Sequence, residues 1–171
     1  MTPPRAGTFI YHTHWHDDAQ LLNGLYGPLI VLEPGQKYDP DHDRIFVFSA
    51  GRFPPFGYLL LVNGHPQPDP VELHRSTRYR LRFINISDNA ADLRVRVTDK
   101  GVPVQWKVIA KDGADLPPAQ LRTSTADMGI TVGETYDVEY EAETQGLADL
   151  EIRQPSFPTP VTVPLKFVEA K

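Results

Sequence analysis

Short apolar runs closed by glycine or proline turns restrict the fold of this chain more than any other feature. Its 171 residues include 17 prolines and 12 glycines, which lie between runs rich in β-branched and aromatic side chains. No long stretch has the 3.6-residue apolar period of an amphipathic helix. Turn dipeptides such as Asn63-Gly64, Lys100-Gly101 and Asp112-Gly113 separate the runs. This pattern predicts an all-β chain that folds as an antiparallel sandwich or barrel.

The expected strands divide the chain unequally. They are Thr8–His14, Leu29–Leu32, Arg44–Ser49, Tyr58–Val62, Arg78–Asn85, Leu93–Thr98, Gln105–Ala110, Gly129–Val132, Tyr136–Tyr140, Leu147–Arg153 and Val161–Val168. Residues 35–43 are interpreted as a polar linker, and residues 44–171 have enough strands for one complete sandwich. Residues 1–34 supply one hairpin, which is marginal in water by itself. We therefore expect this hairpin to pack on residues 44–171 or on another chain.

Charge and composition exclude several classes of function. The net charge is −5 and there is no basic stripe, so we expect no nucleic-acid partner. No apolar run approaches the roughly 18 residues of a membrane span, so no membrane partner is expected either. The N-terminus carries no signal peptide pattern. The chain has no cysteine, so it cannot supply the His₂Cys ligands of a blue-copper electron-transfer site.

Three histidines at alternate positions, His12, His14 and His16, are the strongest candidates for chemistry. Alternate side chains of a strand share one face, so these imidazoles are expected to point the same way as far as the strand extends. Tyr11 and Trp15 are expected on the opposite face, toward a core. Consecutive histidines of the set have Cα atoms roughly 6.5 to 7 Å apart, from a rise of about 3.3 Å per residue. That spacing suits two adjacent metals with one imidazole each, or one metal if the strand bends.

The residues that follow have more than one interpretation. His16 is a candidate third metal ligand, with a hydrogen-bonding partner of the ligands or a plain loop residue as the alternatives. Asp17 and Asp18 are candidates for orienting the imidazoles, or for capping the segment that leads to Leu21, and capping is favoured. Gln20 is expected to anchor this connection.

A resemblance to a known family follows from these residues. The segments Gly7–His14 and Gly24–Val31, with Gln20 between them, resemble the second histidine motif of the multicopper oxidases, the laccase-like enzymes. In that family the motif closes the first cupredoxin domain of the catalytic unit, and its two histidines each bind one type-3 copper. The resemblance therefore implies copper as the cofactor, with His12 and His14 as ligands.

Weaker similarity continues along the chain. Leu61–Gly64, Tyr79–Asn85, Val108–Gly113 and Gly133–Val138 resemble landmarks of a cupredoxin domain without copper in the same oxidases. The resemblance implies a cupredoxin-like Greek-key β-sandwich, with residues 1–34 as the C-terminal hairpin of a neighbouring copper-binding domain. Each landmark also has a structural reading. In Tyr79–Asn85, arginines alternate with apolar residues, which predicts a half-buried strand with a basic outer face.

The resemblance implies a fragment or truncated form of a laccase-like oxidase, periplasmic or secreted. The residues Met1–Pro4 are themselves interpreted as an engineered or truncated start. Such an enzyme couples oxidation of a small-molecule reducing substrate to reduction of O₂ to water. This chain has one His-x-His pair, whereas the family's cluster uses four, so we expect no activity from the chain alone. Its expected partners are further copies of itself, as a homo-oligomer, or the missing cupredoxin domains.

Two other functions stay open. Gly7, His12, His14 and Gln20 roughly match the first motif of cupin-like mononuclear metalloenzymes, although no second motif follows. Bound iron or manganese would favour the cupin-like class, and a preference for copper would favour the laccase-like oxidase. The other alternative is a non-catalytic β-sandwich module that binds partners or mediates assembly through its hairpin.

Overall fold

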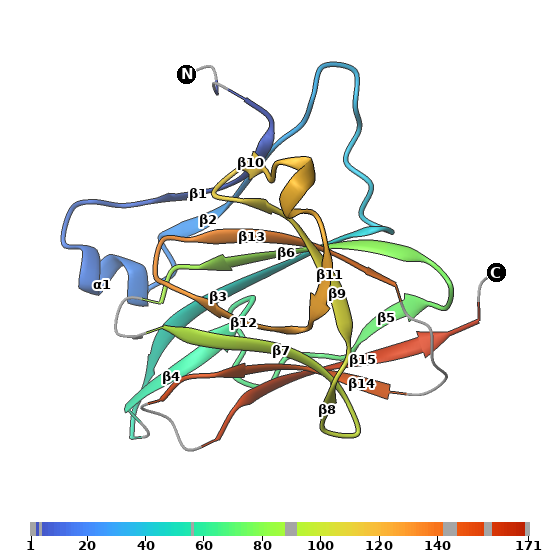
Figure 1. The fold of residues 1–171 in the computed structure, drawn as a ribbon. Coiled ribbons are helices and arrows are strands. Elements are labelled where there is room, and N and C mark those ends of the chain that lie inside the picture. The colour runs from blue at the N-terminus through green and yellow to red at the C-terminus, as the bar shows by residue number, and fades with distance from the viewer. Residues whose placement is uncertain are drawn as a thin grey trace.

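The structure is a computed structural model that describes residues 3, 5–55, 57–87, 92–141, 147–155 and 159–169, apart from the side chains of residues 17 and 18. Two packed β-sheets form a sandwich, and a separate hairpin lies against one of them (Figure 1). The all-β prediction is confirmed. The hairpin pairs β1 (Gly7–His12) with β2 (Tyr26–Val31), and a short helix, α1 (Asp17–Leu22), lies between the two strands in sequence.

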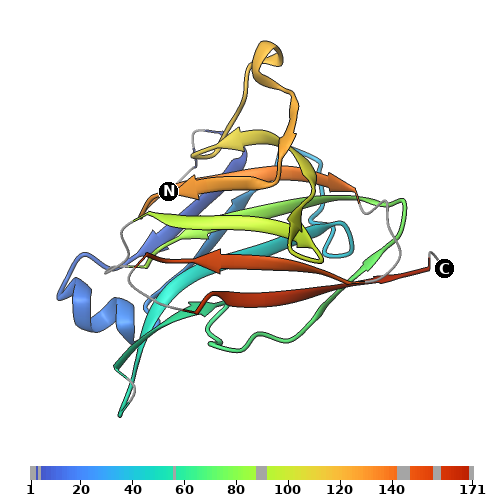
Figure 2. The ribbon, with the colours of Figure 1, turned by 60° about the horizontal axis from the view of Figure 1, so that its bottom comes forward.

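The first sheet carries the hairpin on its outer face. Its strand order is β10 (Ala114–Asp115), β9 (Gln105–Lys111), β13 (Thr135–Glu141), β6 (Arg78–Asn85), β3 (Asp43–Phe53) and β4 (Gly57–Val62), with β11 (Thr123–Thr125) paired to β9. The pairing of β3 with β6 is parallel, whereas the other pairings in this sheet are antiparallel. The 3₁₀ helix η1 (Pro118–Gln120) lies on a loop that projects from the sandwich (Figure 2).

The second sheet closes the other side of the core. Its order is β12 (Asp127–Ile130), β7 (Leu93–Asp99), β14 (Leu147–Arg153), β15 (Val161–Val168) and β5 (Val71–His74), with β8 (Val102–Pro103) paired to β7. Three strands, β6, β14 and β15, match the predicted ranges residue for residue. The short strand β5 and the helix α1 were not predicted, because four and six residues are too few to show a period.

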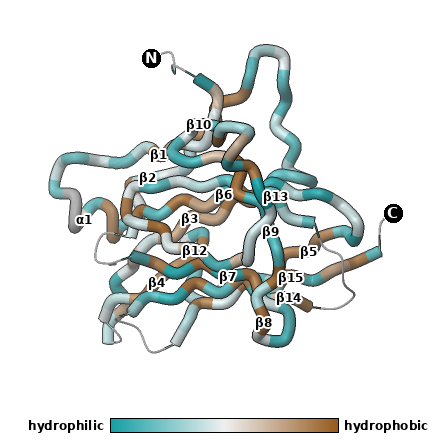
Figure 3. The backbone as a smooth tube through the Cα atoms, viewed as in Figure 1, coloured by the Kyte–Doolittle hydropathy of each residue, from teal (hydrophilic) through white to brown (hydrophobic). Residues whose placement is uncertain are grey.

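The core between the sheets follows the two-residue period of the strands. Hydrophobic and hydrophilic positions alternate along the strands of the sandwich (Figure 3). Phe48 and Phe83 stack with ring centroids 5.9 Å apart, and Trp106 lies 5.7 Å from Phe83. Trp106 is buried, as predicted.

Three predicted turns are confirmed in detail. Asn63 and Gly64 have φ angles of 50° and 83°, and Lys100-Gly101 and Asp112-Gly113 also have positive φ at both residues. Two consecutive residues with positive φ define the primed turn whose twist matches that of antiparallel strands. These dipeptides therefore fix local direction changes in the sandwich.

The hairpin and α1 cover part of the outer face of the first sheet with a second apolar cluster. Its buried members are Leu21, Val47, Ile84 and Ile86, and Ile10, Tyr26 and Ile45 pack against them. The prediction of a basic outer face on β6 holds for Arg78, which is exposed, and for Arg80, which is partly exposed, but needs a correction at Arg82. Arg82 is only 4% exposed, because the hairpin covers it and neighbouring carboxylates neutralise it.

A long connection joins the hairpin to the sandwich. Residues 32–42 contain no helix or strand, and Figure 3 shows this segment as mostly hydrophilic. The division into residues 1–34, 35–43 and 44–171 stays a prediction. Neither helix of the described residues is long and apolar enough to cross a membrane.

Candidate metal centre

The three predicted histidines lie at the end of β1 and in the segment that connects it to α1. β1 ends at His12, two residues before the predicted end, so His14 and His16 belong to the connection to α1. The rings of His12 and His14 are nevertheless adjacent, with centroids 4.5 Å apart and planes inclined at 49°. His12 is half-buried and His14 is exposed. The chain therefore presents two neighbouring imidazoles at the end of the hairpin that the connection through α1 closes.

The His12 side chain has a defined orientation. Its Nδ1 atom lies 2.8 Å from the carbonyl oxygen of Thr13. A carbonyl oxygen can only accept a hydrogen bond, so Nδ1 carries the proton and Nε2 of the neutral ring keeps its lone pair. Histidines that bind metals through one ring nitrogen commonly donate a hydrogen bond from the N–H of the other to a carbonyl oxygen in this way.

The connection between His12 and α1 is held by Gln20, as predicted. The Thr13 hydroxyl donates a short hydrogen bond to the Gln20 side-chain oxygen and accepts one from the Trp15 amide at 3.1 Å. The backbone carbonyl of Gln20 also accepts a hydrogen bond from the amide of Leu25, at 2.9 Å. Gln20 thereby ties α1 to the segments on both sides of it, before the helix at Thr13 and after it at Leu25.

His16 differs from His12 and His14, because it lies just before α1 and has a left-handed backbone conformation. It has a left-handed φ of 50°, occupies the N-cap position of α1, and makes no side-chain cap hydrogen bond. Its ring meets that of Trp15 edge to face, with centroids 5.2 Å apart.

Asp17 and Asp18 follow the N-cap, so neither holds the predicted capping position, and their side chains lie outside the described residues. Across the described residues, no group of three or more His, Cys, Asp or Glu side chains could hold a metal.

Two residues predicted for the core are on the surface instead. Tyr11 is 57% exposed and Trp15 is 72% exposed. On β1, the covered face carries the buried Thr8 and the partly buried Ile10, which packs on the second cluster. The alternation was therefore assigned to the wrong faces, and His12 shares the covered side. Trp15 lies outside β1, so the alternation does not apply to it.

A buried ionic cluster that the sequence did not reveal holds β1 on the sandwich. The Thr8 hydroxyl donates to Asp137 at 2.7 Å and accepts from Nη1 of Arg82 at 2.6 Å. Arg82 also forms a two-bond contact with Asp43, at 2.6 Å for each bond. Burial lowers the pKa of Arg82, but the hydrogen bonds to Asp43 and the charge of Asp137 outweigh it, so its net pKa is raised. The guanidinium is therefore a fixed positive charge at every working pH.

A second seam joins the hairpin to the β9–β10 turn. Arg5 donates to the carbonyl oxygens of Asp112 and Gly113, both at 2.8 Å. The backbone of Gly7 approaches Gly113 so closely that a Cβ atom on Gly7 would lie 2.3 Å from the Gly113 oxygen. The predicted turn at Asp112-Gly113 thus also serves as a docking surface for the hairpin.

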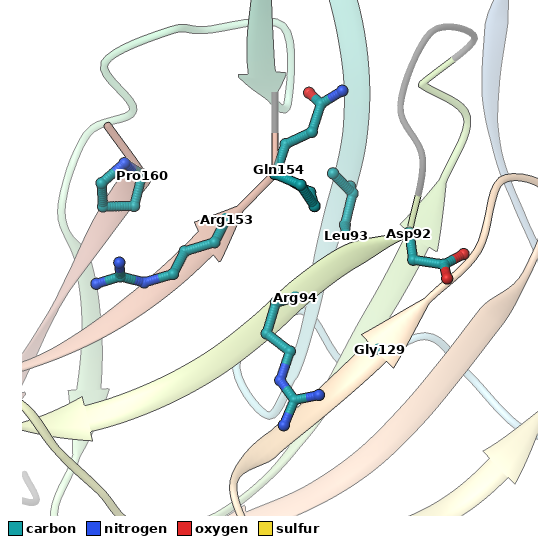
Figure 4. A pocket seen from close by; sticks show the side chains of 8 residues that line it. Asp92, Leu93, Arg94, Gly129, Arg153, Gln154 and Pro160 are labelled. Carbon is teal, nitrogen blue, oxygen red and sulfur yellow. The ribbon is translucent and has the colours of Figure 1, made fainter. Parts of the chain in front are cut away.

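Two cavities lined by described residues lie away from the histidine pair. One of about 450 Å³ on the second sheet is lined by Asp92, Leu93, Arg94, Gly129, Arg153, Gln154, Pro155 and Pro160. Figure 4 shows that its two arginine side chains extend in different directions. Arg94 is paired with Asp127, and Arg153 with Glu151, so neither is an uncompensated cation. A second hollow, of about 420 Å³, is mostly apolar and lies between β2, β3 and the Asn63-Gly64 turn.

Comparisons with known proteins place this geometry in context. No family model matches the chain. Laccase-2 of Cryptococcus neoformans var. grubii is 27% identical over 174 residues, which cover 78% of this chain and 27% of the relative. A laccase of Trametes maxima is 32% identical over 109 residues, covering 51% of this chain and 21% of the relative. The chain thus spans about a quarter of the length of the curated relatives it matches.

Solved structures agree with these relatives. A multi-copper oxidase from Pseudomonas thermotolerans matches with a TM-score of 0.73 and 26% identity, over 96% of this chain and 41% of that one. The McoA multicopper oxidase of Aquifex aeolicus matches with a TM-score of 0.78 and 19% identity, over 98% and 42% of the two chains. The predicted resemblance is confirmed: in sequence and in its cupredoxin-like all-β fold, this chain is related to the laccase-like multicopper oxidases.

Proposed function

We propose that this chain is part of a laccase-like multicopper oxidase and that His12 and His14 are its copper ligands. The observation that carries the proposal is the pair of adjacent imidazoles at the end of β1, 4.5 Å apart between ring centroids. The Nδ1 contact of His12 with the Thr13 carbonyl leaves Nε2 as the electron-pair donor. Imidazole suits copper, and divalent affinities of such sites peak at copper. His16 is a further candidate ligand.

The two imidazoles fit a copper site that is completed by ligands from another domain better than a site formed by this chain alone. The described residues bring two imidazoles together and no third ligand. A copper site built from one such pair needs donors from elsewhere, which matches a cluster assembled between domains. Bound copper would supply the electron-transfer chemistry, and the residues of this chain would hold and orient the imidazoles.

The activity proposed for the assembled protein follows its relatives, which are laccases and multicopper oxidases. We propose oxidation of a small-molecule reducing substrate coupled to reduction of O₂, in a periplasmic or secreted setting. The chain alone contributes one ligand pair and has no cysteine for a blue-copper site. It is therefore proposed to be inactive by itself, because removing parts that act as a unit loses nearly all the rate.

Copper titration tests the proposal. Cu(II) should bind the parent chain, and a His12→Ala/His14→Ala variant should lose most of that binding, as followed by calorimetry and by electron paramagnetic resonance. A His42→Ala/His65→Ala variant is the matched control, because it also removes two imidazoles, both exposed and outside the hairpin.

Two results would contradict the proposal. Equal titrations of the parent and the His12/His14 variant would place the copper ligands elsewhere. A preference for iron or manganese over copper in competition would favour a mononuclear, cupin-like site instead.

A further inference from the structure

The hairpin that carries His12 and His14 depends on contacts with the sandwich. A two-stranded ladder is marginal in water without further packing. The apolar contacts of the hairpin come from Ile10 and Tyr26, which pack on the second cluster. Apolar packing is not directional. Directional bonds hold the hairpin at two other points, on β2 and before β1: the Tyr26 hydroxyl donates to Ser49 at 2.6 Å, and Arg5 donates to the carbonyl oxygens of Asp112 and Gly113.

Thr8 supplies a directional contact on the same strand face as His12. Thr8 is 1% exposed, and its partners Asp137 and Arg82 are 1% and 4% exposed. The carbonyl oxygen of Thr8 also accepts a hydrogen bond from the Thr135 hydroxyl at 2.9 Å. Both the side chain and the backbone of Thr8 are therefore bonded to the first sheet, four residues before His12.

The chemistry at this position requires a hydroxyl. One atom must donate to the Asp137 carboxylate and accept from the Arg82 guanidinium, at 2.7 and 2.6 Å. Serine and threonine can do both at once, whereas valine, of nearly the same shape, can do neither. A shift of β1 by one residue would also turn Thr8 to the opposite face, away from both charges. The hydroxyl therefore ties β1 itself to the first sheet in one register, between the contacts of Arg5 and Tyr26.

We propose that Thr8 is a positioning residue: its hydroxyl, bonded to Asp137 and Arg82, locks the hairpin onto the first sheet and so places His12 and His14. The locking of the hairpin stands on the contacts themselves. Its consequence for copper rests on the proposed function. Asp43 and Arg80 complete the charge balance around the pair, through their own ion pairs with Arg82 and Asp137.

Hydrogen exchange of Thr8→Val tests the lock without metal. The backbone amides of residues 7–12, 26, 27 and 29–31 should exchange about tenfold faster or more than in the parent, because a lost buried hydrogen bond makes local opening easier. Amides of β6 and β13 should keep their protection. Thr8→Ser retains the hydroxyl and should behave like the parent. Thr98→Val is the matched control, because it removes a buried hydroxyl that donates to Glu151 on the second sheet.

The outcomes separate the lock from the copper site. Parental exchange in Thr8→Val overturns the lock, and so does faster exchange that extends over the whole sandwich. If the lock holds, Cu(II) should bind Thr8→Val about tenfold more weakly than the parent and Thr8→Ser about as well, an effect typical of residues that orient ligands. Unchanged copper affinity in a variant with a loosened hairpin overturns the positioning role. A parent chain that binds no copper at His12 and His14 overturns the proposed function, and the exchange data still decide the lock.

Discussion

At the scale of single residues, Glu134 shows how one carboxylate ties a turn to a neighbouring strand. Its side chain accepts a hydrogen bond from the Thr131 amide at 2.9 Å and lies 2.6 Å from the ammonium group of Lys111. Burial raises the pKa of Glu134, but the hydrogen bonds from Lys111 and Thr131 outweigh burial, and the net pKa is lowered from 4.5. The folded state therefore favours the ionised carboxylate.

This lowered pKa predicts a pH dependence of stability. A carboxylate with a lower pKa in the folded state stabilises the fold above its unfolded pKa and loses that contribution as the pH falls through the folded value. Glu134→Gln should therefore cost about 0.5 to 1 kcal/mol of unfolding free energy at pH 7, as expected for a partly exposed ion pair. The difference from the parent should shrink below pH 4.5.

Thermal denaturation from pH 7 to acid, followed by circular dichroism, measures this dependence. Glu33→Gln, at an exposed position on the long connection, is the control and should follow the parent at every pH. A Glu134→Gln deficit that stays constant into acid would show that the ion pair is not its cause.

At the scale of elements, local rules predicted the sandwich well and the placement of the hairpin poorly. Alternation along β6 identified Tyr79, Leu81 and Phe83 as one inward face, because that information lies within eight consecutive residues. Alternation cannot say which face of β1 is covered. Thr8 is buried because of Asp137, 129 positions later, and Arg82, 74 positions later, and no local pattern reports such partners.

At the candidate site, too, the sequence predicted some features and missed others. The motif identified His12 and His14, whose rings lie together, and identified Gln20 as the anchor of the connection. The end of β1 at His12 was missed, so Trp15 was assigned to a core that it does not reach. The polar Thr8 gave no apolar signal, although it holds the strand that carries the histidines.

Removing the hairpin tests the contribution of this element to the fold. A chain that begins at Asp43 exposes Val47 and Ile84 and leaves Arg82 and Asp137 without the Thr8 hydroxyl. Burial of such aliphatic side chains contributes about 1.5 to 3 kcal/mol each, so the loss should be about 3 kcal/mol or more. Urea denaturation should show a lower midpoint for the shortened chain, with the all-β circular dichroism spectrum retained. Equal midpoints would mean that the hairpin adds nothing to the stability of residues 44–171.

At the scale of the whole molecule, the hairpin region exposes four large apolar side chains. Tyr11, Trp15, Leu25 and Leu29 are 57%, 72%, 53% and 41% exposed. Strand edges and apolar side chains exposed together favour association with another surface. The hairpin therefore combines the candidate copper ligands with a surface suited to assembly, so that one contact could both cover the patch and bring further donors to His12 and His14.

We accordingly propose that the chain forms a homo-oligomer through this surface when no further cupredoxin domain covers it. Light scattering over a dilution series should give masses above the 19.2 kDa of one chain at high concentration. Trp15→Ser combined with Leu25→Ser should shift the mass toward one chain, because it removes two of the most exposed apolar side chains of the patch. Val102→Ser removes an apolar side chain that is 67% exposed on β8, outside the hairpin, and should leave the mass unchanged. A parent mass of 19.2 kDa at every concentration would refute self-assembly and leave the separate cupredoxin domains as the proposed cover.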